Sequence, residues 1–321
     1  MRRYIAKQVL MGVLTILFVM VLNFFIIHLA PGDPVRIIAG LDTPNEEQMA
    51  LRRARYGLDQ PLLTQLYKYV VGLFQGDLGT SYTYNQSVSS LIFGTMGNSM
   101  LLALTSCVLA FLIGTGLGLF TARHSGKVLD GLVSYVSYLF DSMPAFWFGL
   151  ISMLVFSSTL HWFPTSGMVN LRAGYTGLSH VWDVMVHLFL PCAVMTLIQI
   201  PQYLRLTRAS VQQVIKEDYI TTFRAAGMSE KHIFRRYVLK NAVLPTITVF
   251  GISLAYVVSG AALVEIVFAW PGTGRLMLNA INRRDYPLLM GIYLMISISV
   301  VVITMLVDLV YAWLDPRIRL K

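Results

Sequence analysis

The residue with the clearest indication of chemistry is Asp141, a carboxylate inside an apolar run and three residues before Pro144. A carboxylate near the centre of a bilayer costs about 2.5–3.5 kcal/mol on insertion scales, so its side chain must face protein or water. Two roles are open: Asp141 lines a pathway through the membrane, or it caps backbone groups that Pro144 leaves free. Glu265 and Asp308 lie near the ends of apolar runs. For these two, reaching the membrane surface or pairing with a loop arginine is a simpler expectation than a proton relay.

Motifs for catalysis and for nucleotide binding are absent from the sequence. It has no G-x-x-x-x-G-K-[ST] phosphate loop, no G-x-S-x-G elbow and no H-E-x-x-H zinc motif. The six histidines do not pair at ligand spacing on one helix, so we expect them at interfaces or in solvent, in preference to a transient metal path. Cys107 and Cys192 lie inside apolar runs and are expected to be buried thiols without a disulfide. We therefore expect no catalytic residue, no resident metal and no cofactor.

The composition is typical of a membrane protein with several spans. Of the 321 residues, 56% are hydrophobic and 13% are charged, against about 25% charged in an average soluble domain. Six apolar runs reach the roughly 20 residues that a helix needs to cross a bilayer. They cover residues 9–29, 99–122, 134–157, 184–204, 242–264 and 288–313. The sequence therefore predicts an all-α polytopic membrane protein with six transmembrane helices.

The basic residues predict the orientation of these helices. Segments on the cytoplasmic side of a membrane protein are enriched in Lys and Arg. If both termini are cytoplasmic, the segments on that side hold most of the 25 basic residues, including the stretch 205–240. The net charge of +9 is then explained by membrane topology and gives no indication of nucleic acid.

Three regions follow from the predicted spans. Residues 1–30 hold a tail and the first helix. Residues 31–97 are expected to form a small extracytoplasmic cap, because turn motifs alternate there with segments that have the pattern of amphipathic helices. Residues 98–321 form the core. Within the core, Gly114 and Gly118 are expected to let another helix approach the second span closely.

A basic, polar segment at residues 217–245 separates the fourth and fifth apolar runs. Helix-forming residues lead to Gly227, which ends a first short helix. Ser229 fits the N-cap of a second helix that runs to about Val243 and is stopped by Pro245. We expect the pair of helices to form a knob held in a groove of a partner protein, the alternative being a basic helix that lies on anionic lipid. The apolar side chains expected in such a groove are Phe223, Met228, Ile233 and Phe234.

This segment resembles the cytoplasmic coupling loop of permease subunits of binding-protein-dependent ABC importers. The general signature there is E-A-A-x-x-x-G with a later I-x-L-P. This chain departs from it, because Thr221 stands where the Glu would be and the distance from Gly227 to Pro245 is longer. Both departures resemble the peptide and nickel branch, where E-D-Y-I-x-T-x-R-A-x-G and L-R-N-A-x-x-P are usual. Here the chain reads E-D-Y-I-T-T-F-R-A-A-G at 217–227 and L-K-N-A-V-L-P at 239–245.

Other motifs similar to those of the branch occur in order along nearly the whole chain. They are P-G-D-P at 31–34, G-L-D-Q-P at 57–61, G-D-L-G at 76–79, P-T-S-G at 164–167, F-A-W-P-G-T-G at 268–274, R-D-Y-P at 284–287 and D-P-R at 315–317. Each motif alone would be weak, and the ordered set is specific.

The resemblance implies the six-helix fold of type I ABC importer permeases in a bacterial cytoplasmic (inner) membrane. The cap would lie between helices 1 and 2, and the coupling loop between helices 4 and 5. The implied partners are a second, different permease subunit, two cytoplasmic ABC ATPase subunits and an extracytoplasmic substrate-binding protein, with membrane lipid around the spans. The binding protein would deliver a short peptide, a glutathione-like compound or nickel, free or chelated. ATP hydrolysis would take place in the ATPase subunits and not in this chain.

The resemblance also implies two sets of functional residues. The expected ATPase-docking residues of the coupling loop are Asp218, Tyr219, Thr222, Arg224, Ala225, Ala226, Gly227 and Met228. The translocation path would run between this chain and the second permease. Its candidate residues are Asp141, Pro144, Glu265, Trp270, Pro271 and Gly272.

Two other classes of protein compete with this interpretation. An ion-coupled secondary transporter would carry inverted repeats and an ionisable pair near the bilayer midplane. The sequence shows no internal repeat and a lone Asp141. An intramembrane enzyme would need a nucleophile and base, or a metal triad, within the spans, and none is evident.

Overall fold

The computed structural model describes residues 2–39, 46–255, 257 and 262–314 of the chain, and these fold into helices joined by short turns and by two longer segments, at residues 75–87 and 160–177. Two of the elements are π-helical turns, η1 and η2, which continue α7 and α10. The elements are α1 (Arg2–Leu29), α2 (Pro34–Ala39), α3 (Glu46–Tyr56), α4 (Leu62–Phe74), α5 (Val88–Arg123), α6 (Val128–Ser142), α7 (Ala145–Ser152), η1 (Met153–Thr159), α8 (Leu178–Val214), α9 (Asp218–Ala225), α10 (Glu230–Ile233), η2 (Phe234–Val238), α11 (Leu239–Ala242), α12 (Leu244–Ala255), α13 (Ala262–Val267), α14 (Thr273–Arg283) and α15 (Tyr286–Leu314).

The helices form two compact units. The first comprises Met1–Ser99, Val258–Ala262 and Pro271–Lys321, and the second comprises Met100–Val257 and Leu263–Trp270. The first unit therefore joins the N-terminal helix and the cap to the C-terminal helix. The long helix α5 begins in the first unit and ends in the second.

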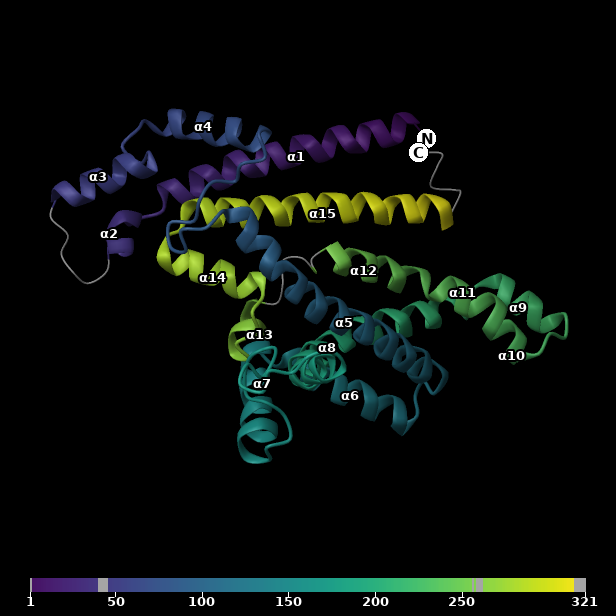
Figure 1. Cartoon of the computed structure of the whole chain (residues 1–321). Helices are drawn as coiled ribbons and strands as arrows, with labels where there is room; N and C mark the ends of the chain where they lie inside the picture. Colours follow the sequence, from purple (N-terminus) through teal and green to yellow (C-terminus); the bar gives the residue numbers. More distant parts are fainter. Residues whose placement is uncertain (1, 40–45, 256, 258–261, 315–321) are drawn as a thin grey trace. The chain divides into compact units, whose positions relative to one another are not determined.

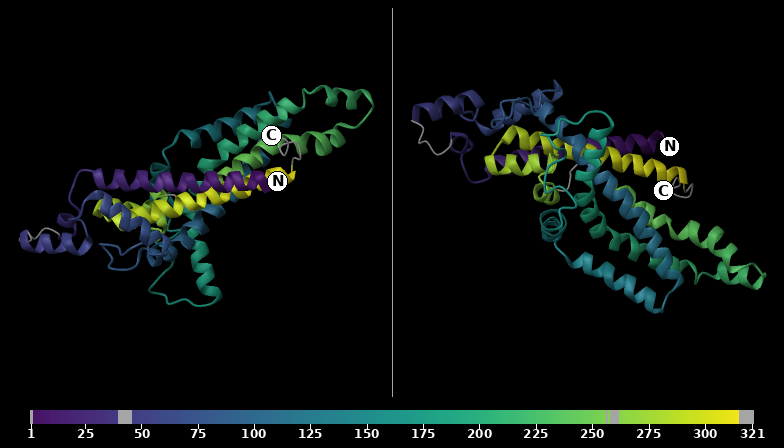
Figure 2. Two further views of the ribbon diagram at one scale, coloured as in Figure 1. Left: turned by 90° about the horizontal axis from the view of Figure 1, so that it is seen from above. Right: turned by 60° about the horizontal axis from the view of Figure 1, so that its bottom comes forward.

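In the first unit, α1 packs along α15 and the two helices run side by side (Figures 1 and 2). Gly12 makes this approach possible, because a Cβ at that position would lie 2.7 Å from Cγ1 of Val301. Small residues at such crossings let membrane helices gain packing contacts that larger side chains would prevent.

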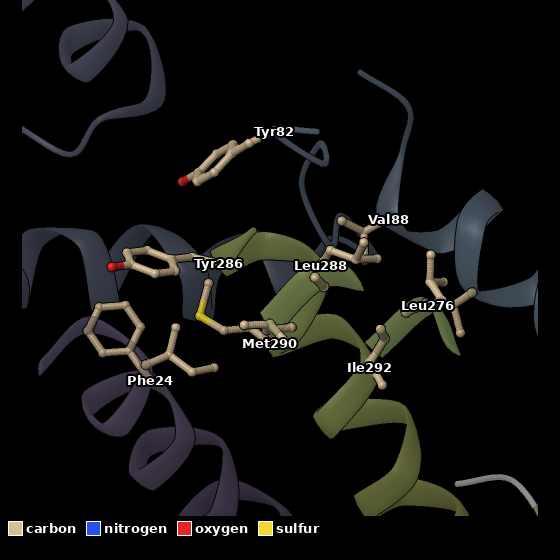
Figure 3. Packing of buried hydrophobic residues seen from close by; sticks show 12 residues of the cluster. Phe24, Tyr82, Val88, Leu276, Tyr286, Leu288, Met290 and Ile292 are labelled. Carbon is tan, nitrogen blue, oxygen red and sulfur yellow. The ribbon is translucent and has the colours of Figure 1, made fainter. Parts of the chain in front are cut away.

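A hydrophobic cluster holds the cap to the ends of α1 and α15 (Figure 3). Phe24 of α1, Tyr82 of the turn segment and Leu288 of α15 are all nearly inaccessible. The helix α5 begins at Val88, eleven residues before the start that the apolar run predicts. The added turns tolerate polar side chains, because hydroxyls such as that of Thr95 donate to carbonyls of their own helix.

The buried carboxylate of Asp285 ties the turn segment to the start of α15. It accepts hydrogen bonds from the Ser81 hydroxyl at 2.5 Å, the Tyr82 amide at 3.1 Å and the Thr83 amide at 3.0 Å. Each buried donor that loses its partner costs about 1–3 kcal/mol. We therefore expect Asp285→Ala to lower the thermal denaturation midpoint of the purified chain clearly. The exposed Asp59 is the matched control, and Asp59→Ala should leave the midpoint unchanged. An unchanged midpoint for Asp285→Ala would contradict this role.

In the second unit, α5 and α8 are in close contact through two glycines of α5. A Cβ at Gly114 would lie 2.8 Å from the carbonyl oxygen of Ile200, and one at Gly118 would lie 2.8 Å from that of Leu204. The prediction of close helix approach at these glycines is confirmed. Thr207, which faces Gly118, also contacts α12, because its hydroxyl lies 2.9 Å from that of Thr246.

The predicted third span is not one continuous helix. The helices α6 and α7 meet at an angle of 102°, and the break falls at Met143 and Pro144. Met143 is extended, with φ −86° and ψ 130°, because the ring of a following proline disfavours the α-helical conformation. Five described helices are long and apolar enough to cross a membrane, or six if the bent pair counts as one span.

The predicted fifth span and its preceding helix differ in their ends. Pro245 does not stop a helix but lies in the first turn of α12, where proline needs no amide hydrogen bond. Residues Glu230–Ala255 together are long and apolar enough to form one membrane span. The later part of the predicted span includes residues 256 and 258–261, which lie outside the described residues. The two cysteines are buried and free, as expected.

Candidate functional site

The coupling segment folds into a hairpin of two helices around Gly227. The helix α9 ends in a Schellman motif, in which the Met228 amide donates to the Phe223 carbonyl at 3.1 Å and the Gly227 amide to the Arg224 carbonyl at 3.0 Å. Gly227 has φ +78°, a left-handed conformation that costs residues with a Cβ about 1–2 kcal/mol. Ser229 occupies the N-cap position of α10, although its side chain makes no capping hydrogen bond. The glycine turn and the two flanking helices are thus as the sequence predicts.

The hairpin has a hydrophobic core of its own. Ile220 of α9 and Ile233 of α10 are almost fully buried and pack in one cluster with Val211 of α8. Phe223 is half-buried, and its ring lies 4.2 Å from that of Tyr237. These contacts hold the hairpin against the end of α8 (Figure 1).

This core corrects one expectation. Phe223, Ile233 and Phe234 pack within this chain, so they are not available to fill a groove of a partner protein. Arg123 of α5 lies over the Phe234 ring at 3.8 Å, which covers that side chain further. Of the four apolar residues predicted for the groove, only Met228 is exposed, at 37%.

The predicted docking residues all lie on the exposed side of the hairpin. They are Asp218, Tyr219, Thr222, Arg224, Ala225, Ala226, Gly227 and Met228. Arg224 reaches across the turn to Glu230, with Nε 2.6 Å from Oε1 and Nη2 3.3 Å from Oε2. That hydrogen bond raises the pKa of Arg224 above its ordinary value. Asn241 donates to the Tyr219 hydroxyl at 3.1 Å and fixes the other end of α9.

A basic hollow lies on the second helix of the hairpin. Its lining residues are Ser229, Lys231, His232, Arg235 and Arg236. All five are exposed, so the hollow presents positive charge beside the neutral tip at Ala225–Met228.

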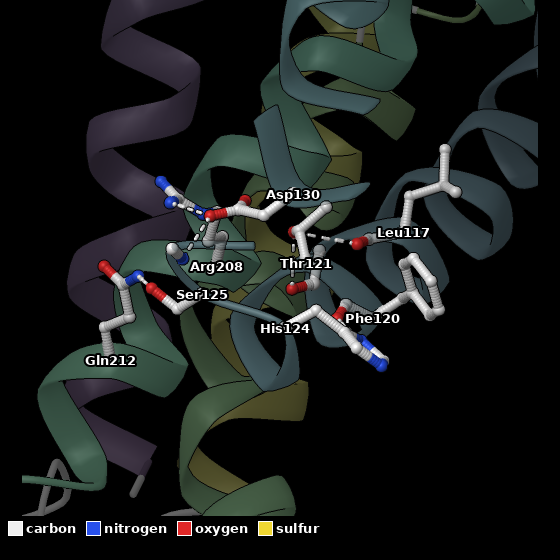
Figure 4. Close-up of polar contacts among 10 residues, drawn as sticks. Leu117, Phe120, Thr121, His124, Ser125, Asp130, Arg208 and Gln212 are labelled. Atoms are coloured by element: carbon white, nitrogen blue, oxygen red, sulfur yellow. Dashed lines mark hydrogen bonds and ion pairs between the residues drawn. The ribbon is translucent and has the colours of Figure 1, made fainter. Parts of the chain in front are cut away.

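A second polar cluster joins α6 to α8 (Figure 4). Nη2 of Arg208 lies 2.7 Å from Oδ2 of Asp130, whose side chain is buried, and the Gly126 amide donates to the same oxygen at 3.2 Å. Gln212 donates to the Ser125 hydroxyl at 3.0 Å. Sequence reasoning did not single out Asp130 or Arg208. Their signal was present, since Asp130 and Asp141 are eleven residues apart and so share one face of an α-helix.

Asp141 also has a partner on α8, which is Arg205. Both side chains are 42% exposed, and the Arg205 guanidinium lies 5.8 Å from the centre of the Tyr138 ring. Asp141 is therefore not the lone carboxylate that the sequence suggested, and it accepts hydrogen bonds from Arg205 and not from the backbone beside Pro144. A half-exposed ion pair at the broken span is a polar surface among apolar helices.

Pro144 is the N-cap residue of α7, and the other candidate pathway residues lie in α13 and in the turn between α13 and α14. Trp270 and Glu265 are fully buried, and Trp270 packs in a cluster with Leu102 and Cys192. Of the two roles expected for Glu265, reaching the membrane surface does not agree with its burial by its own chain, and pairing with a loop arginine stays a prediction. The buried Gly272 is the N-cap of α14, and Pro271 is exposed.

Comparison with known proteins decides the family. Residues 114–320 match the family described as the inner membrane component of binding-protein-dependent transport systems, and residues 1–103 match its N-terminal companion family. The chain belongs to this family. As a binding-protein-dependent transport permease, it is a multi-pass inner membrane protein with a transport role, and the secondary-transporter and intramembrane-enzyme interpretations fall away.

Several curated relatives match this permease over almost its full length. The oligopeptide transport system permease protein AppB of Bacillus subtilis (strain 168) is 35% identical over 99% of this chain and all of its own length. The glutathione transport system permease protein GsiC of Salmonella typhimurium (strain LT2) is 35% identical over all of both chains. The di/tripeptide transport system permease protein DppB of Pseudomonas aeruginosa (strain UCBPP-PA14) is 34% identical over 99% of each.

A solved structure supports the fold of this permease. A structure of the MetNI methionine ABC transporter in inward-facing conformations matches 70% of this chain and 96% of its own chain, with a TM-score of 0.54 and 17% identity. The all-α ABC permease fold that the sequence predicts is thereby confirmed.

Proposed function

We propose that this permease is one of two different membrane subunits of an ATP-driven importer of short peptides. The partners in this proposal are a second permease, two cytoplasmic ATPases and an extracytoplasmic binding protein. The relatives at 34–35% identity carry names for oligopeptide, glutathione and di/tripeptide transport, which favours peptides over nickel. The observation that carries the proposal is the hairpin around Gly227, which is held rigidly from within and exposes the eight predicted docking residues.

The hairpin is suited to docking on a protein. Its core is complete, so docking requires little ordering of the loop, and preorganisation of this kind lowers the cost of binding. Anionic lipid fits the basic hollow less well. Counted from Ala242, where the sequence predicts that the fifth span begins, Lys231 lies eleven residues and about 16 Å along a helix away from the bilayer, whereas a headgroup layer is about 5–8 Å thick. We place the hollow against an acidic part of an ATPase, and closure of the ATPases would move the spans by rigid-body alternating access.

The substrate is tested by uptake into proteoliposomes that contain the complete transporter and its binding protein. Labelled dipeptide, labelled glutathione and nickel are supplied separately, with an ATPase-inactive complex as the control. We expect ATP-dependent uptake of dipeptide or glutathione. Uptake of nickel alone would overturn the peptide assignment, and uptake by the ATPase-inactive complex would overturn the coupling.

We propose that the ion pair of Asp141 and Arg205 lines the translocation path on the side of this chain. Both side chains of the pair are only half covered by this chain, and charged side chains among apolar helices typically face a water-filled path or a protein partner, so the pair is a candidate for the wall of the path. We expect Asp141→Asn to reduce uptake while assembly and the thermal midpoint stay unchanged.

The matched control is Arg53→Gln, which removes the half-exposed ion pair of Arg53 and Asp33 in the cap and should leave uptake intact. If Asp141→Asn prevents assembly or lowers the thermal midpoint, the pair is structural and the pathway assignment fails.

The proposed topology places both termini and the hairpin in the cytoplasm and the cap at residues 31–97 outside. Asn85 and Ser229 are both exposed, so a cysteine at either position is open to a thiol reagent on its own side of the membrane. In intact cells we expect an impermeant maleimide to label Asn85→Cys but to label Ser229→Cys only after permeabilisation. A cysteine at Thr43, in the same predicted outer region, is expected to be labelled from outside as well, and Thr43 lies outside the described residues. Labelling of Ser229→Cys from outside would reject the topology together with the docking proposal.

A further inference from the structure

The helix α4 of the cap has two apolar faces, and only one of them is covered by the chain. Leu66 and Tyr69 pack against the hydrophobic cluster of the first unit. Leu63, Tyr67 and Phe74 are 72%, 70% and 82% exposed. Their spacing of four and seven residues places them on one side of an α-helix.

The remaining face of α4 is polar. Thr64, Lys68 and Gln75 project between the exposed apolar face and the packed face, and all three are exposed. A helix with a large exposed apolar face and a separate polar face matches the pattern of helices that lie in a membrane interface. Lys68 is the only charged residue of α4, and its long stem lets the ammonium reach the headgroups.

The depth of α4 identifies what covers the exposed face. The ring of Tyr69 stacks on that of Phe24 of α1, with 6.2 Å between centroids and 23° between planes. Phe24 lies five residues before Leu29, the end of a candidate span that covers Ala6–Leu29. Five residues of helix correspond to about 7–8 Å, and interfacial helices bury their apolar face about 5–10 Å into the boundary of headgroups and acyl chains.

The surface next to α4 is also apolar and exposed. On the same stretch of α1, Leu22, Ile26 and Leu29 are 44%, 57% and 69% exposed. These residues belong to a span, so lipid is the ordinary environment for their exposed side chains. The exposed face of α4 thus adds to the lipid-facing surface at the cap end of α1.

We propose that α4, which runs alongside α1 (Figures 1 and 2), lies against lipid, with Leu63, Tyr67 and Phe74 inserted among lipid chains at the cap side of the bilayer. Tyrosine and other aromatic residues are enriched at this depth, where a ring meets the acyl chains and a hydroxyl meets the headgroups. The cap is then anchored to the bilayer beside α1 and does not stand free in the outer solution. The anchor does not depend on the substrate or on the ATPases.

The test uses nitroxide labels on the full chain, reconstituted with its partner subunits in lipid nanodiscs. Cys107 and Cys192 are buried and are replaced by alanine, so that single cysteines at Leu63, Tyr67 or Phe74 carry the label. Thr64→Cys and Gln75→Cys on the polar face are the matched controls. Collision rates are measured with oxygen, which concentrates among acyl chains, and with water-soluble chromium oxalate.

We expect labels at 63, 67 and 74 to collide more with oxygen and less with chromium oxalate than labels at 64 and 75. Labels at 63, 67 and 74 that collide with chromium oxalate as often as the controls would show a face in water. Labels shielded from both reagents would show a face covered by protein, such as the binding protein or the second permease. Either of these two results overturns the proposal.

Discussion

Gly227→Val is expected to reduce ATP-driven uptake several-fold while membrane insertion and the folding of the spans remain intact. Gly227 has φ +78° at the centre of the Schellman motif, and nothing lies within 4 Å of a Cβ built there. The effect of valine is therefore backbone strain without a clash. A strain of about 1–2 kcal/mol changes the population of the hairpin conformation by about 5- to 30-fold, and a β-branched residue is penalised further. Uptake and co-purification with the ATPase measure the result.

The chain offers a close control for this substitution. Gly174 has φ +58° in another turn, and a Cβ there would also meet nothing within 4 Å. Gly174→Val introduces the same kind of strain away from the hairpin and should leave uptake intact. Gly227→Asn should retain more activity than Gly227→Val, since asparagine tolerates the left-handed conformation. Normal uptake by Gly227→Val would count against the docking role of the hairpin.

Gly118→Leu is expected to prevent the helices of the second unit from packing. A Cβ at Gly118 would lie 2.7 Å from the Thr207 Cβ and 2.8 Å from the Leu204 carbonyl oxygen. Backbone and Cβ atoms cannot rotate away, so α5 and α8 must separate. Overpacking costs about 1–3 kcal/mol or more, and here it would also disturb the hydroxyl contact between Thr207 and Thr246. Thermal denaturation and the yield of monodisperse protein measure the loss.

Gly116 is the control on the same helix. It is exposed, and a Cβ there would meet nothing within 4 Å. Gly116→Leu adds the same volume to α5 on another face and should leave the thermal midpoint of the purified chain close to that of the parent. If Gly118→Leu is as stable as Gly116→Leu, the close contact of α5 with α8 is not needed for folding.

Local sequence signals predicted much of the candidate site. The left-handed turn at Gly227 could be predicted because only glycine adopts this conformation freely. The exposure of the docking residues could be predicted from the polar residues around that glycine. The sequence could not predict on which side of the hairpin the aromatic residues lie. Phe223 and Phe234 are apolar in any context, and whether they serve the chain's own core or a partner depends on what α5 and α8 place beside them.

The sequence by itself determined the membrane class, the apolar lengths, the family resemblance and the glycines that allow close packing, because each of these is a property of composition, period or residue type. Only the tertiary structure decided which side chains of this chain contact each other. Asp141 meets Arg205 across 64 positions, and Asp285 meets Ser81 across 204. Local sequence preferences cannot predict contacts between residues so far apart in the sequence, because a carboxylate meets its hydrogen-bond donor only after the helices pack. The break at Pro144 lies between these cases, because proline predicts an interruption and packing sets its angle.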